Sequence, residues 1–349
     1  VKAFSVGYKN DNELKSYTNE FEFAQQAAKH TNCEYYQQEL TQQDFIDFLP
    51  KLIHHQDEPI GDPVCMPVYY VSKLAKENNI TVCQVGEGSD ELFWGYETWK
   101  YLLRLQNLTD IKLIPNFLKK ALLKGLSIAG KEDAVYYEWL KRGTENKKIF
   151  WGGAEAFSET QKNKLLSKEF KKNIEPNYSS WSVINKHYQD FLAKAPEKSN
   201  LNWMTYMDLK MRLPELLLMR VDKMSMAVSL EARVPFLDDR FVTHAMGISS
   251  KLKTKKKVSK YILKKAVEGL IPNNIIYRKK QGFGAPVYDW MMDDLGDIAK
   301  EKIELFNKNT GYLDMIYVDS VFQRKDGRQI WYLLNLALWW EYYIYEKAN

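Results

Sequence analysis

Two patterns of apolar and polar positions divide the chain near residue 96. In the first part, short apolar segments typical of strands alternate with segments of helical periodicity. The strand-like segments are KAFSVGY (2–8), CEYYQQEL (33–40) and ITVCQV (80–85), and the helical ones are NEFEFAQQAAKH (19–30), DFIDFLPKLIHH (44–55) and PVYYVSKLAKEN (67–78). This alternation predicts an α/β fold with a doubly wound parallel sheet that helices cover on both faces.

After Tyr96 the strand pattern fades and helical periodicity dominates. The helical segments are YLLRLQNL (101–108), KKALLKGL (119–126), 200–233, SKYILKKAVEGL (259–270) and IWYLLNLALWWEYYIYE (330–346). No internal repeat or low-complexity linker separates the two parts. We therefore expect one domain over 1–349, with an α/β nucleotide-binding part at 1–96 and a large, mainly helical extension at 97–349.

Composition indicates a globular protein of mixed surface charge. The 349 residues are 45% hydrophobic and 27% charged, and the net charge is +5. That modest excess is only a weak indication of anionic ligands. The three cysteines, Cys33, Cys65 and Cys83, form no Cys-x-x-Cys pair, so we expect reduced thiols and a cytoplasmic location.

The most apolar run, IWYLLNLALWW (330–340), has 11 residues and contains Asn335. It is far shorter than the roughly 20 residues that span a bilayer, so it predicts a buried helix, and we expect no membrane partner. The chain opens on VKAFSVGY, which reads as a strand already under way, without an initiator Met. We expect the protein to extend upstream of Val1.

The stretch VGEGSDELFWGY (85–96) follows the strand ITVCQV, and ligands of doubly wound sheets bind at the carboxyl ends of strands. Gly86 leaves room for a flat ring or a sugar, and Glu87, Asp90 and Glu91 follow it closely. Acids in the first turn of a helix are common caps. Three acids and three glycines on one turn nevertheless indicate a ligand. Carboxylates repel phosphate unless a cation such as Mg²⁺ bridges them, so we expect a divalent ion here.

The segment GEGSDELFWGY (86–96) resembles the signature of the asparagine synthetase family, in its synthetase domain. The segments RVDKMSMAVSLEARVPFLDDRF (220–241), IPNNIIYRKKQGFGAPV (271–287), VKAFSVGY (1–8) and DEPIGDP (57–63) agree with it. The resemblance implies the ATP pyrophosphatase, or adenine nucleotide α-hydrolase-like, fold. It also implies ATP-dependent amide formation: a carboxylate attacks the α-phosphate, pyrophosphate leaves, and ammonia displaces AMP from the acyl-adenylate.

The resemblance assigns roles to the residues of the turn and of the basic loop 271–287. Glu87 matches the family's essential glutamate, which would take a proton from attacking ammonia or hold it in line. Asp90 matches the Mg²⁺ position, and Lys280 matches the catalytic lysine that stabilises charge on the phosphate. Glu91 would take part in catalysis or orient a basic partner. Residues matching the nucleotide site are Val6, Val85, Gly86 and Tyr96, of which Tyr96 would contact the nucleotide or only pack.

In the 220–238 block, we take Arg220 and Asp222 as candidate substrate-binding residues. The other charged residues, Lys223, Glu231, Arg233 and Asp238, favour salt bridges that hold the helical layer to the sheet. Met219, Met224 and Met226 are expected in the core. His54 and His55 are adjacent on a helix and would face different ways, which favours a surface or capping role.

The sequence also departs from the family. It contains neither the N-terminal glutaminase domain that normally supplies ammonia nor the Ser-Gly-Gly-x-Asp-Ser loop that holds pyrophosphate. We therefore expect that residues 1–349 alone do not form an acyl-adenylate. Gly61 and Val64 stand where a polar pair would hold aspartate, so the acceptor is aspartate or a sugar acid of surface polysaccharides.

Two other classes stay open at this point. An RNA-modifying adenylating enzyme would use the lysine-rich run 251–265 to bind phosphates, although that run also reads as a solvated face. A non-catalytic interaction module would keep the fold without the chemistry, but the joint presence of Glu87, Asp90 and Lys280 opposes it. A homodimer is our expectation for the assembly.

Overall fold

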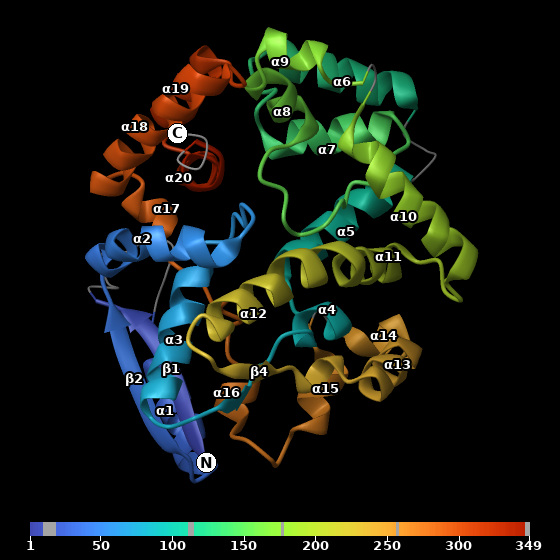
Figure 1. The fold of residues 1–349 in the computed structure, drawn as a ribbon. Helices are drawn as coiled ribbons and strands as arrows, with labels where there is room; N and C mark the ends of the chain where they lie inside the picture. The colour runs from blue at the N-terminus through green and yellow to red at the C-terminus, as the bar shows by residue number, and fades with distance from the viewer. Residues whose placement is uncertain (10–18, 111–114, 176–177, 256–257, 346–349) are drawn as a thin grey trace.

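A βαβ unit opens the chain, as the sequence predicts. The computed structural model describes residues 1–9, 19–110, 115–175, 178–255 and 258–345, and Figure 1 shows their arrangement. Strand β1 (Lys2–Tyr8) pairs in parallel with β2 (Glu34–Leu40), in register from Lys2 opposite Glu34 to Tyr8 opposite Leu40. Helix α1 (Phe21–His30) precedes β2 and packs on this sheet. The carboxyl end of β1 is its buried end, because Val6, Gly7 and Tyr8 are all buried.

Helices α2 (Gln42–Gln56) and α3 (Cys65–Glu77) follow at the predicted positions. Thr41 begins α2 through a capping box with Asp44, in which each side chain satisfies a backbone N–H of the other residue. Helix α3 packs against β1, β2 and α12 (Met219–Met226). It thereby joins the βαβ unit to a segment far downstream.

The predicted single doubly wound sheet is wrong in its extent. Among the described strands, β3 (Val82–Gln84) pairs in parallel with β4 (Glu231–Arg233), in a two-stranded sheet separate from β1 and β2. Val82 is 40% exposed, so β3 is not covered on both faces. The expected helical stretch 200–233 ends in β4 because Ser229 adopts a left-handed conformation (φ 57°) after α12. The protein is thus a mostly helical α/β structure with small parallel sheets.

The described residues of 97–207 are mainly helical, as predicted, and occupy the right side and upper right of Figure 1. Its core contains the buried rings of Trp94, Trp99, Phe150 and Trp203. The helices of this segment are α5 (Glu97–Asp110), α6 (Asn116–Ile128), α7 (Val135–Thr144), α8 (Glu159–Leu165), α9 (Lys168–Lys172), α10 (Ser180–Lys194) and α11 (Asn200–Met207).

The run 330–340 forms a buried helix, as expected. Helix α20 (Gly327–Trp340) buries Trp331 and Leu334 completely and packs against α18 (Asp294–Thr310), α17 (Val287–Trp290) and α2. The π-helix η4 (Glu341–Tyr345) continues it. Because α20 contacts both α17, which follows the basic loop, and α2, its buried residues belong to the same core as those of the βαβ unit.

Shorter elements connect these parts. After α11 the chain continues as the π-helix η2 (Asp208–Leu218) and then α12. The remaining short elements are α4 (Ser89–Phe93), η3 (Pro235–Leu237), α13 (Asp239–Gly247), α14 (Ser250–Lys253), α15 (Tyr261–Ala266), α16 (Asn273–Ile276) and α19 (Met315–Gln323).

Three further expectations can be compared with the structure. Met224 is buried and Met219 packs against the core, but Met226 is 54% exposed, because it is the last residue of α12 and lines an open cavity. The three cysteines are free thiols. Within the described ranges, no helix has the length and apolar content needed to cross a membrane.

Candidate active site

The motif 85–96 runs from the end of β3 through α4 to Tyr96. Val85 extends the pairing of β3, since its N–H donates to the Arg233 carbonyl at 2.8 Å. Gly88 then takes a left-handed conformation (φ 92°), and a Cβ on it would lie 2.4 Å from Leu237, so a larger residue does not fit there. Gly86 faces open space. The turn is therefore rigid at Gly88 and unobstructed at Gly86.

Asp90 is the meeting point of two lysines from distant segments. Lys280 Nζ donates to Asp90 Oδ2 at 3.1 Å, and Lys260 Nζ lies 2.9 Å from Asp90 Oδ1. Lys260 also donates to the Ser89 hydroxyl at 2.9 Å. Burial alone would raise the pKa of Asp90, but the charges of Lys260 and Lys280 outweigh it and hold that pKa below its ordinary value. Two lysines and one aspartate give this cluster a formal charge of +1.

Gly95 makes this arrangement possible. A Cβ at residue 95 would lie 1.6 Å from Asp90 Oδ1 and 2.4 Å from Lys260 Cε. The side chain of Asp90 and the stem of Lys260 therefore occupy the space that any other residue would need. The third glycine of the motif is thus explained by the ion pair itself.

Glu87 belongs to a second cluster, which is centred on Arg220. The Arg220 guanidinium donates to Glu87 Oε1 and to Asp62 Oδ2, both at 2.7 Å. Arg220 and Asp62 are buried, with 6% and 8% of their surfaces exposed, whereas the Glu87 side chain is 22% exposed. Burial alone would lower the pKa of Arg220, but Asp62 and Glu87 raise it. Two carboxylates and one guanidinium give this cluster a formal charge of −1.

Glu91 and Tyr96 form a third, buried set with η2. Tyr96 donates its hydroxyl proton to Glu91 Oε1 at 2.5 Å, and the guanidinium of Arg212 lies 4.6 Å from the Tyr96 ring centre. Burial raises the pKa of Glu91, against the opposing effect of the Tyr96 hydrogen bond. Arg212 in turn pairs with Asp208 at 3.3 Å. A cavity of about 300 Å³ adjoins this set and is lined in part by Tyr96 and Arg212. Glu91 is therefore placed to orient basic and phenolic neighbours.

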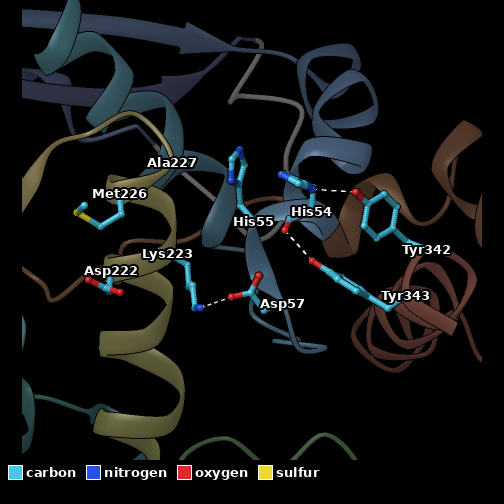
Figure 2. A pocket seen from close by; sticks show the side chains of 9 residues that line it. All are labelled: His54, His55, Asp57, Asp222, Lys223, Met226, Ala227, Tyr342 and Tyr343. Carbon is cyan, nitrogen blue, oxygen red and sulfur yellow. Dashed lines mark hydrogen bonds and ion pairs between the residues drawn. The ribbon is translucent and has the colours of Figure 1, made fainter. Parts of the chain in front are cut away.

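The remaining predicted residues lie apart from these clusters or at their edge. Val6 is buried in the main core and pairs opposite Gln38. Asp222 lies two residues after Arg220 on α12 but lines a different cavity of about 470 Å³, shown in Figure 2. The structure thus separates Arg220 from Asp222, although both are candidate substrate residues.

That second cavity lies between the end of α2, α12 and η4. In Figure 2, Lys223 points across it to Asp57, with which it forms an ion pair, and His54 faces Tyr342, whose hydroxyl lies 2.8 Å from its Nδ1. The expected surface role of His54 agrees with this contact. Nowhere in the described part of the chain do three or more His, Cys, Asp or Glu side chains group closely enough to hold a metal ion. Lys223, the lysine of this cavity, is already paired with Asp57, which makes the cavity the weaker candidate site.

Sequence reasoning missed two residues of the clusters. Lys260, which is half-buried, belongs to the run 251–265, which was expected to be a solvated face, and Lys253 of the same run is buried, with 1% exposed. That expectation is wrong for both, because the run folds back onto α4, where the Lys260 N–H donates to the Phe93 carbonyl at 3.0 Å. Lys256 and Lys257 lie outside the described residues. Asp62 was quoted within DEPIGDP, and its position between Gly61 and Pro63 before a helix was the available signal.

The salt bridges expected in the 220–238 block are present but local. Lys223 pairs with Asp57, and Arg233 pairs with Glu231 on the same strand at 2.7 Å. Asp238 begins α13 by accepting hydrogen bonds from the N–H groups of Arg240 and Phe241. Of these contacts, Lys223 with Asp57 joins α12 to the segment after α2.

Comparison with known proteins connects this geometry to a family. A sequence model described as "Asparagine synthase" matches residues 1–341. The chain is 33% identical over 346 residues to "Asparagine synthetase [glutamine-hydrolyzing] 1" of Bacillus subtilis, which covers 97% of this chain and 52% of that protein. It is 27% identical over 312 residues to a "Putative asparagine synthetase [glutamine-hydrolyzing]" of Mycobacterium tuberculosis, which covers 85% of this chain and 44% of that protein. The chain spans about half the length of these curated relatives.

Proposed function

The chain belongs to the asparagine synthase family, and we propose that its two charged clusters form the adenylating site of an ATP-dependent carbon–nitrogen ligase. The family is ATP-dependent, and the relatives' names describe glutamine-hydrolysing synthetases. The observation that carries the proposal is the pairing of two clusters of opposite charge on one turn. The cluster of formal charge +1 suits a polyphosphate, and the cluster of formal charge −1 suits ammonia and its cationic adduct.

The cationic cluster supports the adenylation step. An acceptor carboxylate oxygen attacks the α-phosphorus of ATP, the bond to the β-phosphate breaks, and pyrophosphate leaves. Negative charge accumulates on the phosphate oxygens during this step. Lys260 and Lys280 each carry three N–H donors and spend only part of them on Asp90 and Ser89. Their remaining donors are available to the phosphates, where fixed positive charge lowers the barrier.

The anionic cluster supports the amide-forming step. Ammonia attacks the acyl carbon, and the nitrogen becomes positively charged until it loses a proton and AMP departs. Glu87 is partly exposed, and Arg220 fixes one of its oxygens. Its carboxylate can therefore accept that proton or stabilise the cationic nitrogen. Asp62 holds Arg220 from the other side, so it positions Glu87 without having to touch the substrate.

The donor set fits a magnesium ion only in part. Asp90 is the candidate protein ligand, but both of its oxygens lie within contact distance of lysines. An ion held by this chain would rely on phosphate oxygens for most of its ligands, which is usual for Mg²⁺ at nucleotide sites. When bound, the ion would neutralise phosphate charge. Asp90 itself orients Lys260 and Lys280.

The acceptor we favour is a carboxylate other than aspartate, such as a sugar acid. A Cβ on Gly61 would lie 2.3 Å from the ring of Tyr332, so the ring occupies the place of a side chain at position 61. A polar residue that would hold aspartate there is sterically excluded. This observation supports the alternative acceptor, whereas the burial of Lys253 and the pairing of Lys260 with Asp90 weaken a role of the run 251–265 in RNA binding.

Carboxylate-dependent conversion of ATP to AMP and pyrophosphate tests the proposal. The assay, like the variants below, uses the protein with any residues that precede Val1 in the natural chain, because residues 1–349 alone are not expected to form an acyl-adenylate. Ammonium salts serve as the nitrogen donor, so the assay does not depend on a glutaminase. We expect AMP to form only with a suitable carboxylate and an amide to appear in equal amount. Formation of ADP, or AMP formation that ignores the carboxylate, would contradict adenylation of the acceptor.

A further inference from the structure

Helix α6 (Asn116–Ile128) exposes an unusual number of large apolar side chains. None of its residues is buried. The exposed fractions are 68% for Phe117, 50% for Leu118, 58% for Leu122 and 80% for Ile128. In Figure 1 the helix lies at the periphery of the helical part, at the end of the molecule opposite β1 and β2. Single exposed apolar residues are normal, but four on one short helix form a patch that needs a partner.

The exposed apolar residues share one face of the helix. At 100° per residue, Phe117, Leu118, Ala121, Leu122 and Ile128 fall within one side of α6, and all five are exposed. The half-buried residues lie on the other side, where Lys119 donates to the Thr109 carbonyl at 2.8 Å. Helix α7 packs against α6 and holds it in place. The apolar strip is therefore presented to solvent by a helix that is already folded.

Lysines border this strip, and no acid interrupts them. Lys120 and Lys124 are exposed on α6, and Lys131 is exposed just beyond it. The sequence from 115 to 131 contains no Asp or Glu. Glu132 and Asp133 follow, but both are paired with Lys164, at 3.1 and 3.0 Å. The face thus combines apolar side chains with unopposed positive charge.

We propose that α6 binds in the plane of an anionic lipid membrane, with Phe117, Leu118, Leu122 and Ile128 in the apolar boundary and Lys120 and Lys124 at the headgroups. Basic helices with one apolar face bind such surfaces by burying that face and attracting anionic lipids. Charge complementarity favours this partner over a second copy of the chain. Two copies packed strip to strip with their helices antiparallel would place the lysine edges of both helices on the same side, where like charges repel.

This placement agrees with the absence of a spanning helix among the described residues. A helix of 13 residues is about 20 Å long, too short to cross a bilayer but long enough to lie along its surface. The sequence-based expectation of no membrane partner rested on the lack of a spanning segment, and this proposal departs from it. Because α6 is held by α7 before it meets lipid, binding needs no coupled folding.

Co-sedimentation of the protein with vesicles tests the proposal. One set of vesicles is phosphatidylcholine alone, and the other is an equal mixture of phosphatidylcholine and phosphatidylglycerol. We expect binding to the anionic vesicles, weakened by salt. Phe117→Ser with Leu122→Ser should lower the partition coefficient by about ten-fold or more, since two large apolar side chains no longer enter the membrane. Lys120→Gln with Lys124→Gln should lower it by about five-fold for each lysine.

Matched controls come from exposed residues on other helices. Ile316→Ser on α19, where Ile316 is 84% exposed, and Lys300→Gln on α18 should leave vesicle binding unchanged. Because all these residues are exposed, circular dichroism and thermal melts should match the parent protein. Absence of binding to the anionic vesicles would overturn the proposal. So would binding that survives the α6 substitutions, or loss of a dimer in the Phe117 and Leu122 variant without any vesicle binding, since a second copy would then cover the face.

Discussion

Lys260 Nζ lies 2.9 Å from Asp90 Oδ1, although the two residues are far apart in the sequence. Lys260 reaches this position from a left-handed backbone conformation (φ 53°) at the start of α15. Burial lowers the pKa of Lys260, and Asp90 opposes that shift. A partly buried ammonium held against a carboxylate, with Lys280 on the other oxygen, is a preformed site for an anion that replaces part of this contact.

The first prediction concerns the lysines. Lys260→Ala and Lys280→Ala should each lower the rate of carboxylate-dependent pyrophosphate release by about 10²- to 10³-fold, because each removes a fixed charge at the phosphates. Steady-state assays of pyrophosphate measure this. Lys255→Ala is the control, since Lys255 lies 5.4 Å from the ring centre of Tyr261 and outside the cluster. If all three variants lost the same share of the rate of pyrophosphate release, Lys280 and Lys260 would contribute only general positive charge and no specific contact with the phosphates.

The second prediction concerns Glu87. Glu87→Gln should bind ATP with little change but lose amide formation by orders of magnitude, because the amide cannot accept a proton from the attacking nitrogen. Equilibrium binding of ATP and quantification of the amide product separate the two effects. Glu231→Gln serves as a control, since that glutamate pairs with Arg233 on β4, outside both clusters. A normal product yield from Glu87→Gln would remove the residue from the mechanism.

The part of the fold that the sequence predicts well is the part made of long periodic segments. The unit from β1 to β2 and the buried helix α20 appear where their periodicity places them. Strand β4 was missed because three residues carry no measurable period and its partner β3 lies far upstream. Strand pairing at that distance depends on tertiary packing, which local pattern does not encode.

The residues of the candidate site divide in the same way, into those that a local motif indicates and those that only tertiary contacts reveal. Glu87, Asp90 and Lys280 stand in motifs whose spacing indicates chemistry. Lys260 stands in a lysine-rich run, and the sequence does not distinguish it from the other lysines there. Its contact with Asp90, which only the structure shows, marks it as a residue of the site. Asp62 is likewise distinguished by Arg220, a residue that approaches from α12. Contacts of this kind arise from the fold and have no local signal in the sequence.

The third prediction uses the pH dependence of stability. Burial raises the pKa of Asp208 from its ordinary value of 3.8 to about 6. Between these values the unfolded chain has lost the proton that the folded protein keeps, so stability falls as pH rises through this window. Asp208→Asn should abolish that fall, which amounts to about 3 kcal/mol in the free energy of unfolding. Urea unfolding from about pH 4 to about pH 7 measures it. If the free energy of unfolding fell equally with pH in Asp208→Asn and in the parent protein, the raised pKa of Asp208 would be contradicted. Asp190→Asn is the control, because Asp190 lies in an exposed ion pair.

The fourth prediction concerns the acceptor. Aspartate should be a poorer acceptor than a hexuronic acid, judged by kcat/KM in the AMP-forming assay. The reason is the Tyr332 ring beside Gly61, which leaves no room for a polar side chain at that position. Efficient production of asparagine at low millimolar aspartate would overturn this prediction. Tyr332→Phe, which keeps the ring, should leave the preference unchanged if the effect is steric.

The fifth prediction tests whether Arg220 holds Glu87 and Asp62 as one unit. Arg220→Gln removes the positive charge that both carboxylates share, and Asp62 is 8% exposed, so an unpaired buried charge remains. Loss of one partner from a buried ion pair costs about 3–5 kcal/mol, measured as the free energy of unfolding.

The double variant Arg220→Gln with Asp62→Asn should recover part of this loss, because the charge that lost its partner is itself removed. A double-mutant cycle by urea unfolding would then give a coupling free energy of about 1–3 kcal/mol between the two sites. Strict additivity would show that Asp62 is solvated independently of Arg220. In that case Asp62 would not hold Arg220 in place, and the anionic cluster would be two separate contacts.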